Sequence, residues 1–385
     1  MKWEVRDVFG DKKNNICIIG GGNIGTLLMG DIGSRENVSL RLLTSRPDEW
    51  SNEIEVYNIN DEFKYVGKVD IISDKPFDVI PNADIIILTV PSHVFPKIII
   101  NIEPFIKKGT LIGVMPGSGG AEFYCKRLIE KGCILFGFER VHGIARIKEY
   151  GKSVYDLGKK NELHIASIPT KEIRYVCMKM EQIFKVRCKP LKNYLNVTLT
   201  PSNPILHTTR IYTLLYNYKK DTCYNEVIKF YEDWNNDASK MLFLCDKELQ
   251  DICRMIKGLD LRGVKSLKEY YESETIEEMT EKIRNIDAFK GIGLPMLEID
   301  KGYIPDFFSR YFLEDFPFGL CIIKGFSDIV GIDTPNIDKI LRWFQKISKL
   351  EYYVNGKFEG KDLKNLPLPR NYGLNSIEDI ILFYS

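Results

Sequence analysis

The feature that most constrains this chain is a glycine-rich stretch near its N-terminus. It reads ICIIGGGNIG, an apolar run that ends in the spacing Gly20-x-Gly22-x-x-Gly25, and the next residues can begin a helix. This strand, glycine turn and helix form the fingerprint of a dinucleotide-binding unit. The first glycine permits the tight turn, the second lets backbone approach a pyrophosphate, and the third allows close helix packing. The predicted cofactor contacts in this loop are Gly20, Gly22, Asn23, Ile24 and Gly25.

Further apolar runs follow at intervals that suit a doubly wound parallel sheet. From about residue 193 the pattern changes, and apolar residues recur at the spacing of amphipathic helices. The sequence therefore predicts an α/β protein with an N-terminal Rossmann-type sheet, residues 1–192, and an all-α C-terminal substrate domain, residues 193–385. Near the C-terminus, Asn355-Gly356 suits a two-residue hairpin turn. The predicted strands are 38–44, 83–90 and 109–117, with 133–138 and 162–168 extending the sheet or its edge.

The amino-acid composition limits the class of binding partner. Lysine plus arginine (54) nearly equals aspartate plus glutamate (53), so no charge bias favours nucleic acid or an anionic membrane, and a small-molecule partner is expected. The charged start MKWEVRDVFGDKKNN is not a signal peptide, and no apolar run reaches the length of a membrane span. The nine cysteines are scattered and never spaced CxxC. We expect reduced thiols of a cytoplasmic protein, with neither a disulfide framework nor a metal site.

The end of the second predicted strand indicates which nucleotide binds. An enzyme that selects NAD normally presents a carboxylate there to the ribose 2′-hydroxyl. This chain has Ser45 and Arg46 instead, a hydroxyl and a guanidinium that suit a 2′-phosphate. NADP(H) is therefore the favoured cofactor. In the alternative, Arg46 is a solvated loop residue and Asp48 or Glu49 approaches the ribose, which would make NAD(H) the cofactor.

A histidine follows a predicted helix start in the second domain. Asn203 suits a helix cap and Pro204 the first helical position, which would place His207 in the first turn, at the seam with the sheet. Histidine exchanges a proton near neutral pH, so His207 is a candidate acid and base. The alternative is a packed structural imidazole.

The stretch FFSRYFLEDFPFGL supplies two further polar groups. Arg310 and Asp315 stand among large apolar residues, where unpaired charges are costly. A carboxylate can fix the tautomer of a histidine, and an arginine can clamp a substrate carboxylate. Glu314 faces elsewhere and is expected to be solvated. The alternative is an Arg310–Glu314 helix pair, worth roughly 0.2 to 0.5 kcal/mol, with His207 packed elsewhere.

The strand at 83–90 ends at the side of the sheet where nucleotides bind. Val90 and Pro91 are expected to contact the cofactor there. His93 follows them, and we favour a role in capping the next helix over contact with the cofactor. His164 lies within an apolar strand and is interpreted as structural.

Taken together, these stretches resemble the octopine/nopaline dehydrogenase family, the opine dehydrogenases. The resemblance runs over nearly the whole length and is most specific in NPILH and RYFLEDFPFGL, in that order and separation. It is carried also by GGGNIG, ILTVPSHV, MPGSGGAEFYC, FERVHGIARIKEYGKSV and the tail GKDLKNLPLPRNYGLNSIEDIIL.

The resemblance implies a Rossmann domain joined to a helical domain. It further implies NAD(P)H-dependent reductive condensation of an amino acid with a 2-oxo acid such as pyruvate. The family's catalytic histidine falls on His207, its partner aspartate on Asp315 and its substrate-handling arginine on Arg310. In that mechanism the amine adds to the keto carbon, water leaves, and hydride reduces the imine.

The chain also departs from the family pattern. Ser118 stands where a family loop carries a glutamine, and ERVHGIAR lacks a tryptophan found there, so the amino-acid substrate need not be arginine. His142 is a new polar group in that loop, and it either touches substrate or lies at the surface. Arg146 matches a family arginine without an assigned role. The expected substrate contacts are Ser118, Asn203, Arg310 and His142.

Two other functions stay open at this point. A dehydrogenase with the same two domains could reduce a 2-oxo acid directly to a hydroxy acid, because the same histidine, carboxylate and arginine would serve. A nucleotide-binding redox sensor could keep the glycine loop without chemistry. Such a sensor would be free to lose His207 or Arg310, and this chain keeps both.

Overall fold

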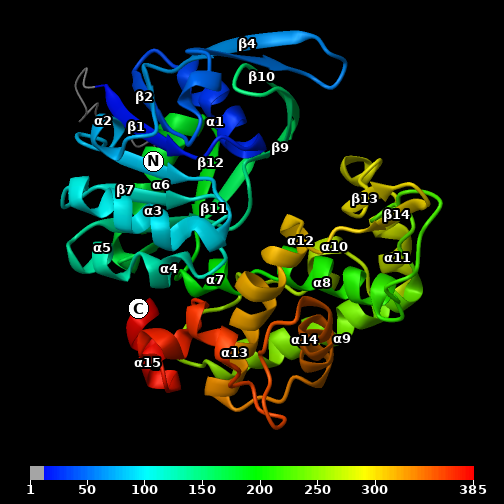
Figure 1. Cartoon of the computed structure of the whole chain (residues 1–385). Helices are drawn as coiled ribbons and strands as arrows, with labels where there is room; N and C mark the ends of the chain where they lie inside the picture. The colour runs from blue at the N-terminus through cyan, green and yellow to red at the C-terminus, as the bar shows by residue number, and fades with distance from the viewer. Residues whose placement is uncertain (1–12) are drawn as a thin grey trace.

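A computed structural model describes residues 13–385 of the chain. The first twelve residues, which form most of the charged segment used above against a signal peptide, lie outside the described residues. Figure 1 shows two lobes, one built around a sheet and one mostly helical, joined along one side. Among residues 13–385, no helix is both long and apolar enough to cross a membrane.

The first lobe is built on an eight-stranded sheet. Six neighbouring strands run parallel, and the two at one edge run the opposite way, because β11 pairs antiparallel with β8. The glycine-rich loop follows the central strand β1, whose neighbours are β6 and β2. In spatial order the strands are β12 (Arg187–Pro190), β11 (Glu162–Ile168), β8 (Ile134–Phe138), β7 (Leu111–Val114), β6 (Ile85–Leu88), β1 (Asn14–Ile19), β2 (Val38–Leu43) and β5 (Ile71–Ser73).

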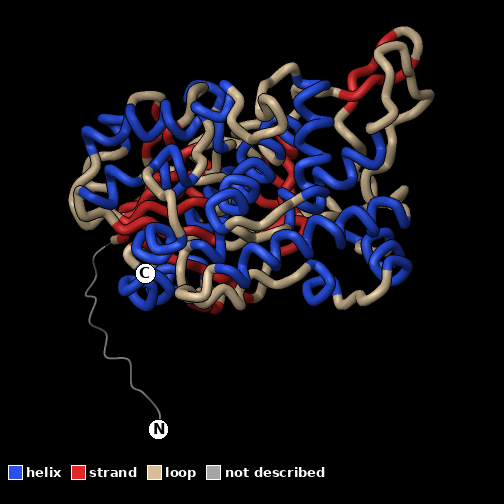
Figure 2. The backbone as a smooth tube through the Cα atoms, turned by 90° about the horizontal axis from the view of Figure 1, so that it is seen from below, coloured by secondary structure: helices blue, strands red, loops and turns tan. Residues whose placement is uncertain are grey.

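The strand β1 and the strands β6 to β8 are almost entirely buried, as a sheet covered on both faces requires. Figure 2 shows the strands inside and the helices around them. The helices of this lobe are α1 (Asn23–Gly33), α2 (Pro76–Val79), α3 (Phe95–Ile102), α4 (Ala121–Tyr124), α5 (Lys126–Glu130) and α6 (Ile173–Phe184).

A second sheet covers helix α1 and was not predicted. None of its strands was recognised, because the expected strands were the apolar ones. β3 and β9 alternate buried and exposed residues over part of their length, the pattern of a sheet with one solvated face. In spatial order they are β4 (Phe63–Lys68), β3 (Glu53–Tyr57), β10 (Ser153–Lys159) and β9 (Gly143–Glu149).

The second lobe is mainly helical, with α8 and the twenty-residue α9 packed against each other at its centre. It also carries a hairpin, β13 (Met296–Ile299) and β14 (Gly302–Pro305), which projects from the body in Figure 2 and which the all-α prediction missed. Its helices are α7 (Leu195–Thr198), α8 (Ser202–Leu215), α9 (Asn236–Met255), α10 (Leu267–Tyr271), α11 (Ile276–Arg284), α12 (Arg310–Leu313), α13 (Cys321–Val330), α14 (Pro335–Ser348) and α15 (Ile377–Tyr384).

The predicted C-terminal hairpin is reduced to its turn. Asn355 and Gly356 both adopt positive φ, and Val354 and Lys357 exchange two backbone hydrogen bonds of 2.9 Å. The flanking residues form no strand ladder beyond this single bridge. The turn chemistry was predicted correctly, but the neighbours pack into the lobe instead of pairing.

The chain's last helix returns to the first lobe. The Tyr384 hydroxyl donates to a carboxylate oxygen of Glu122 on α4 (2.7 Å), and Thr198 on α7 donates to the same oxygen (2.5 Å). Glu122 is fully buried, and burial raises the pKa of its carboxyl. One apolar core runs through both lobes. The lobes are therefore packed together along α4, α7 and α15.

Candidate active site

The glycine loop has the shape that a dinucleotide needs. Gly20 has a φ of +112°, and a side chain on Gly25 would collide with the Gly20 carbonyl oxygen. A Cβ on Gly22 would meet nothing within 4 Å, so the space in front of that residue is open. Helix α1 begins directly after Gly22 with no side chain capping its free N–H groups. Open space before an uncapped helix N-terminus suits a pyrophosphate.

The side chain of Asn23 points away from this open space. Its Oδ1 accepts a hydrogen bond from the backbone N–H of Ile147 on β9 (2.8 Å), which ties α1 to the second sheet. Ile24 packs against the apolar clusters on both sides of α1. The Asn23 Oδ1 and the Ile24 side chain are therefore engaged within the protein, and the backbone of these two residues remains available to a nucleotide.

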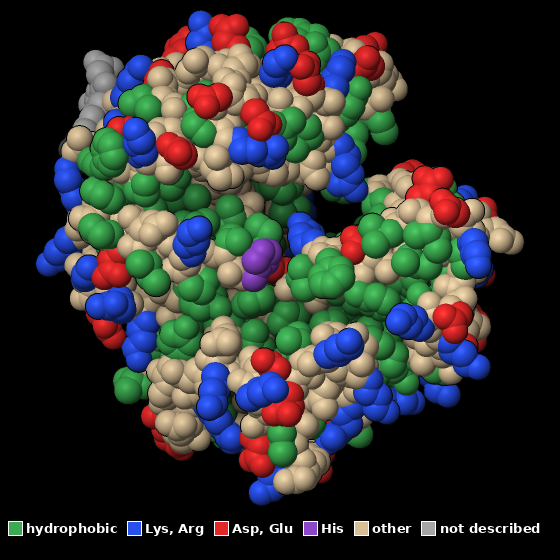
Figure 3. Space-filling view, viewed as in Figure 1, with side chains coloured by type: hydrophobic (Ala, Val, Ile, Leu, Met, Phe, Trp, Pro, Cys, Tyr) green, Lys and Arg blue, Asp and Glu red, His purple; other side chains and the backbone are tan. Residues whose placement is uncertain are grey.

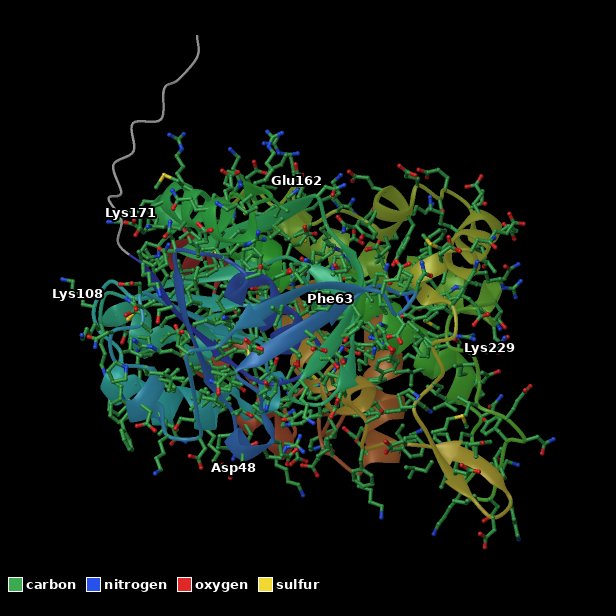
Figure 4. The ribbon with its side chains drawn as sticks, turned by 90° about the horizontal axis from the view of Figure 1, so that it is seen from above. Asp48, Phe63, Lys108, Glu162, Lys171 and Lys229 are labelled. Atoms are coloured by element: carbon green, nitrogen blue, oxygen red, sulfur yellow. The ribbon has the colours of Figure 1, made fainter. Side chains whose placement is uncertain are left out.

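Ser45 and Arg46 stand where they were expected, just after β2, and both are exposed. The Arg46 guanidinium lies 4.1 Å from the ring centre of Tyr150 and 3.1 Å from a carboxylate oxygen of Glu49. Glu49 belongs to the short helix η1 (Pro47–Glu49). Asp48, labelled in Figure 4, lies at the edge of the first lobe. The guanidinium is thus held at the end of β2, with one of the two candidate carboxylates beside it.

The segment after β6 links the two lobes. Val90 and Pro91 are half-buried and lead into the short helix η2 (Ser92–Val94). The Ser92 backbone N–H donates to both carboxylate oxygens of Glu314 in the second lobe, at 2.8 and 3.0 Å. The expectation that Glu314 is solvated is wrong, because this carboxylate is an acceptor between the lobes.

His93 does not cap a helix, contrary to the favoured interpretation. Neither η2 nor α3 has a side-chain cap, and the His93 ring lies 3.8 Å from Glu314. The interaction with Glu314 raises the pKa of His93. His164 sits between Glu139 and Glu162, with 2.9 Å from each ring nitrogen to a carboxylate oxygen, and these partners raise its pKa.

His207 and Asp315 form a buried pair. Nδ1 of the ring lies 2.7 Å from Oδ2 of the carboxylate, and the two residues are only 5% and 4% exposed. They come from elements 108 residues apart, α8 and the turn that follows α12. Helix α8 begins at Ser202, so Asn203 lies within its first turn and is not its cap. His207 consequently occupies the second turn and not the first.

The His207–Asp315 pair is positioned by two segments that pack closely together. Residues Phe316–Leu320 form a π-helical turn, η6, which packs directly on α8. A Cβ on Gly319 would lie 3.0 Å from Pro204, so glycine is what lets the two backbones come together. Asp315 immediately precedes this turn and therefore faces the histidine one turn further along α8.

Three residues of the site were missed by the sequence analysis. The Tyr231 hydroxyl lies 2.8 Å from Nε2 of His207, and the Tyr311 ring stacks on the imidazole with centres 4.6 Å apart. Arg210, almost fully buried on α8, donates from Nε to the carbonyl of Phe230 (2.8 Å) and so holds the Tyr231 segment. Burial lowers the pKa of Arg210 to about 10.

Arg310 is exposed at the start of α12, contrary to the expectation that it lies among apolar side chains. Its side chain forms no hydrogen bond or ion pair with the described residues, so the alternative Arg310–Glu314 side-chain pair is not present; the two residues share only a backbone hydrogen bond of 2.9 Å. Figure 3 shows a notch between the lobes on the face drawn in Figure 1, with β9 and β10 on one side and α12, β13 and β14 on the other. Arg310 and Arg146 of β9 both act on the Tyr311 hydroxyl electrostatically. Two cationic side chains from opposite lobes thus approach the same tyrosine.

Ser118 and His142 have different surroundings. Ser118 is half-buried, and its neighbour Gly119 contacts Ser92 at the seam between the lobes. His142 is 3% exposed, so the surface interpretation is wrong. Its Nε2 lies 3.3 Å from Asp31 of α1, and its ring packs on Phe184, within the first lobe. The structure therefore does not bring His142 together with His207.

Burial would raise the pKa of Asp31, but the contacts with His142 and Lys159 outweigh it and hold the pKa at about 2. His142 thus belongs to a charged network that fastens α1 to the second sheet. No group of three or more histidine, cysteine, aspartate or glutamate side chains within residues 13–385 is arranged to hold a metal ion.

Comparison with known proteins gives consistent results. Residues 190–348 match the family model described as NAD/NADP octopine/nopaline dehydrogenase, alpha-helical domain. The chain is 29% identical to tauropine dehydrogenase of Arabella iricolor, over 95% of this chain and 99% of the relative. It is 27% identical to octopine dehydrogenase of Pecten maximus, over 95% and 98% of the two chains. The solved structure of an octopine dehydrogenase with NADH and agmatine superposes with a TM-score of 0.82, at 26% identity, over 95% of this chain and 97% of that one.

Proposed function

Because this chain belongs to the NAD/NADP octopine/nopaline dehydrogenase family, we propose that it is an opine dehydrogenase. The reaction is the NAD(P)H-dependent reductive condensation of an amino acid with a 2-oxo acid such as pyruvate. The observation that carries the proposal is the buried His207–Asp315 pair, in which Nδ1 and Oδ2 lie 2.7 Å apart. A buried histidine with a carboxylate on one nitrogen is built to hold and release a proton.

The residues of the first lobe fit a dinucleotide. The open space before Gly22 and the uncapped start of α1 would receive the pyrophosphate, and Val90 and Pro91 would border the nicotinamide at the end of β6. When bound, the cofactor supplies the hydride. We propose a domain boundary at residue 192, with the nucleotide bound by residues 1–192 and the substrates by residues 193–385. The proposed location is the cytoplasm, where nine scattered cysteines suit a reducing environment.

His207 is the proposed acid and base. Condensation needs a proton on the oxygen that leaves as water, and the reverse reaction needs its removal. Asp315 fixes the tautomer of the ring and stabilises its charged form. Arg310 is exposed at the start of α12, and its side chain has no hydrogen bond or ion pair with the described residues, so it is free to hold a carboxylate of the 2-oxo acid in a fork. Ser118 and Asn203, both half-buried, are the proposed amino-acid contacts.

NADPH is the proposed preferred cofactor. Arg46 is positioned over Tyr150 at the end of β2, and its ion pair with Glu49 can be exchanged for one with a 2′-phosphate. We expect Arg46→Ala to raise the KM for NADPH at least about tenfold, the size of one charge-assisted contact, and to leave the KM for NADH nearly unchanged. Equal effects on both cofactors would show that Glu49 or Asp48 binds the ribose and that NADH is the natural cofactor.

The test of function is NADPH and NADH oxidation followed at 340 nm with pyruvate, repeated with each of the twenty amino acids. Oxidation that requires both pyruvate and a particular amino acid, and that His207→Ala abolishes, supports the proposal and names the substrate. Reduction of pyruvate alone would instead indicate a 2-hydroxy acid dehydrogenase. A chain that binds NADPH but oxidises it with no substrate pair would behave as a nucleotide sensor. Product analysis by mass spectrometry separates the first two results.

A further inference from the structure

Both nitrogens of His207 are already engaged within the protein. Nδ1 faces Asp315 at 2.7 Å and Nε2 faces the Tyr231 hydroxyl at 2.8 Å. The ring is 5% exposed, with Tyr311 stacked on one face and the edge of Phe230 against it. A substrate atom therefore has no free nitrogen to meet. The proton of His207 must leave through the group that occupies Nε2.

Tyr231 is held firmly in that position. Its ring stacks on Phe289 with centres 4.1 Å apart and 17° between the planes, and the residue is 4% exposed. Arg210 fixes the preceding carbonyl, that of Phe230. The Tyr311 hydroxyl interacts electrostatically with that of Tyr231, and the Tyr311 ring stacks on the same imidazole. Tyr231 is thus a buried hydroxyl bonded to the imidazole, with a second tyrosine beside it.

Tyr311 is the more exposed of the two tyrosines. It is only partly buried, whereas His207 and Tyr231 are almost completely covered. Arg310 from its own helix and Arg146 from β9 of the other lobe both act on its hydroxyl. A hydroxyl that feels cations from both lobes lies where the lobes face each other.

We propose that Tyr231 and Tyr311 form the proton path between His207 and the substrate. The proposal rests on the function proposed above and adds two residues to it. With His207 charged, Nε2–H donates to Tyr231, Tyr231 donates to Tyr311, and Tyr311 donates to the substrate oxygen that leaves as water. Each O–H bond that breaks is replaced from the group behind it, so one proton moves from the imidazolium to the substrate. His207 ends neutral, accepting from Tyr231, and the reverse reaction runs the path backwards.

The electrostatics agree with a path of neutral hydroxyls. Burial raises the pKa of Tyr231 well above its ordinary value, and burial also raises the pKa of Tyr311. Neither side chain would therefore rest as a phenolate near neutral pH. Each can accept one proton only as it gives up another, which is what a relay between donor and acceptor requires.

The kinetic test uses Tyr231→Phe and Tyr311→Phe, which keep the stacked rings and remove only the hydroxyls. Each is expected to lower kcat roughly 100-fold or more, the usual loss for a positioned proton donor, while the KM values for cofactor and 2-oxo acid change less than about threefold. The double variant should lose little beyond either single one, because the two hydroxyls act as a unit. Tyr352→Phe is the control, since Tyr352 is equally buried and its hydroxyl has no partner among the described residues.

Wild-type kcat in Tyr231→Phe would overturn the proposal and mean that His207 meets the substrate directly. Wild-type kcat in Tyr311→Phe would overturn the second step. Losses that add in the double variant would also contradict the path, because they would indicate two independent packing effects.

A second measurement keeps the proposal testable if the opine function itself fails. The chain has only four histidines, so ¹⁵N-labelled imidazoles can be resolved by NMR, and His207→Gln identifies the signals of interest. We expect Tyr231→Phe to shift the Nε2 signal of His207, Tyr311→Phe to shift it less, and Tyr352→Phe to leave it unchanged. An unaltered His207 signal in Tyr231→Phe would overturn the path whatever the enzyme's substrates are.

Discussion

Replacing Asp315 by asparagine should separate the charge of this carboxylate from its shape. Asparagine can still accept the Nδ1–H of His207 through its oxygen, so the ring keeps its orientation at the 2.7 Å contact. What disappears is the attraction between a carboxylate and the imidazolium. At a separation of charge centres of about 4 Å and an effective dielectric constant of about 20, that attraction is about 4 kcal/mol.

A loss of that size corresponds to almost three factors of ten in rate, since each 1.4 kcal/mol is about tenfold. Part of it will be recovered by solvent and by relaxation, so we expect kcat to fall about 100-fold to 1,000-fold with KM values nearly unchanged. The assay is NADPH oxidation with the substrate pair identified for the wild type. Asp246→Asn is the matched control, because it makes the same exchange at another buried carboxylate of the same lobe.

A kcat within about threefold of wild type in Asp315→Asn would refute the reasoning. It would mean that His207 never carries a charge during the rate-limiting step, or that it takes no part in the reaction. An equal fall in the Asp246→Asn control would point to lost folding instead, which thermal unfolding of both variants would reveal.

Three further predictions test other parts of the molecule. Gly22→Ala should leave the melting temperature unchanged or slightly higher, because its Cβ meets nothing within 4 Å. It should weaken NADPH binding at least about tenfold, because the methyl group fills the pyrophosphate space. Calorimetry measures the melting temperature and fluorescence titration the affinity, and an unchanged affinity would contradict the site. Glu314→Gln should lose one of the two bonds to Ser92, about 1 kcal/mol of unfolding free energy. The variant should also lose less stability than wild type as pH rises above 6.5. Glu314 raises the pKa of His93, so this ion pair stabilises the wild type at low pH and its contribution fades as pH rises. Burial raises the pKa of Asp246 from 3.8 to about 6, so up to about 3 kcal/mol of stability should be lost as pH rises through that range. Asp246→Asn should therefore have a higher melting temperature than wild type at pH 7 and nearly the same one at pH 4. Melting curves identical to those of wild type at both pH values would exclude this cause.

The fold was readable from the sequence where one pattern allowed one structure. The spacing Gly20-x-Gly22-x-x-Gly25 after an apolar strand fixed the nucleotide loop, and the apolar runs located the inner strands of the large sheet. The second sheet was missed because its strands carry polar residues on one face and so lack a continuous apolar run. The hairpin β13–β14 escaped for a similar reason, since three of the four residues of β13 are exposed.

Glu314 shows why local patterns mislead near a break in a helix. Spacing suggested a partner four residues back, at Arg310, or a solvated carboxylate. Helix α12 has only four residues, however, and Glu314 closes it with φ −112° and ψ −58°, away from ideal helical values. The altered backbone sends the carboxylate to Ser92 of the other lobe, 222 residues away. No spacing rule within the segment contains that contact.

The Tyr231 hydroxyl was not predicted for a different reason. Chemistry alone says that a buried histidine with a carboxylate on one nitrogen needs a partner on the other, so a second polar group near His207 could have been required in advance. The chain has 20 tyrosines, however, and Tyr231 stands in an irregular segment with no periodic pattern. The one usable clue is Arg210, three residues after His207 on the same helix. A buried arginine without a carboxylate partner must donate to backbone carbonyls, and the carbonyl it reaches is that of Phe230, next to Tyr231. The sequence could therefore have demanded the partner and even its kind of support, but only the packing of α8 identifies which tyrosine it is.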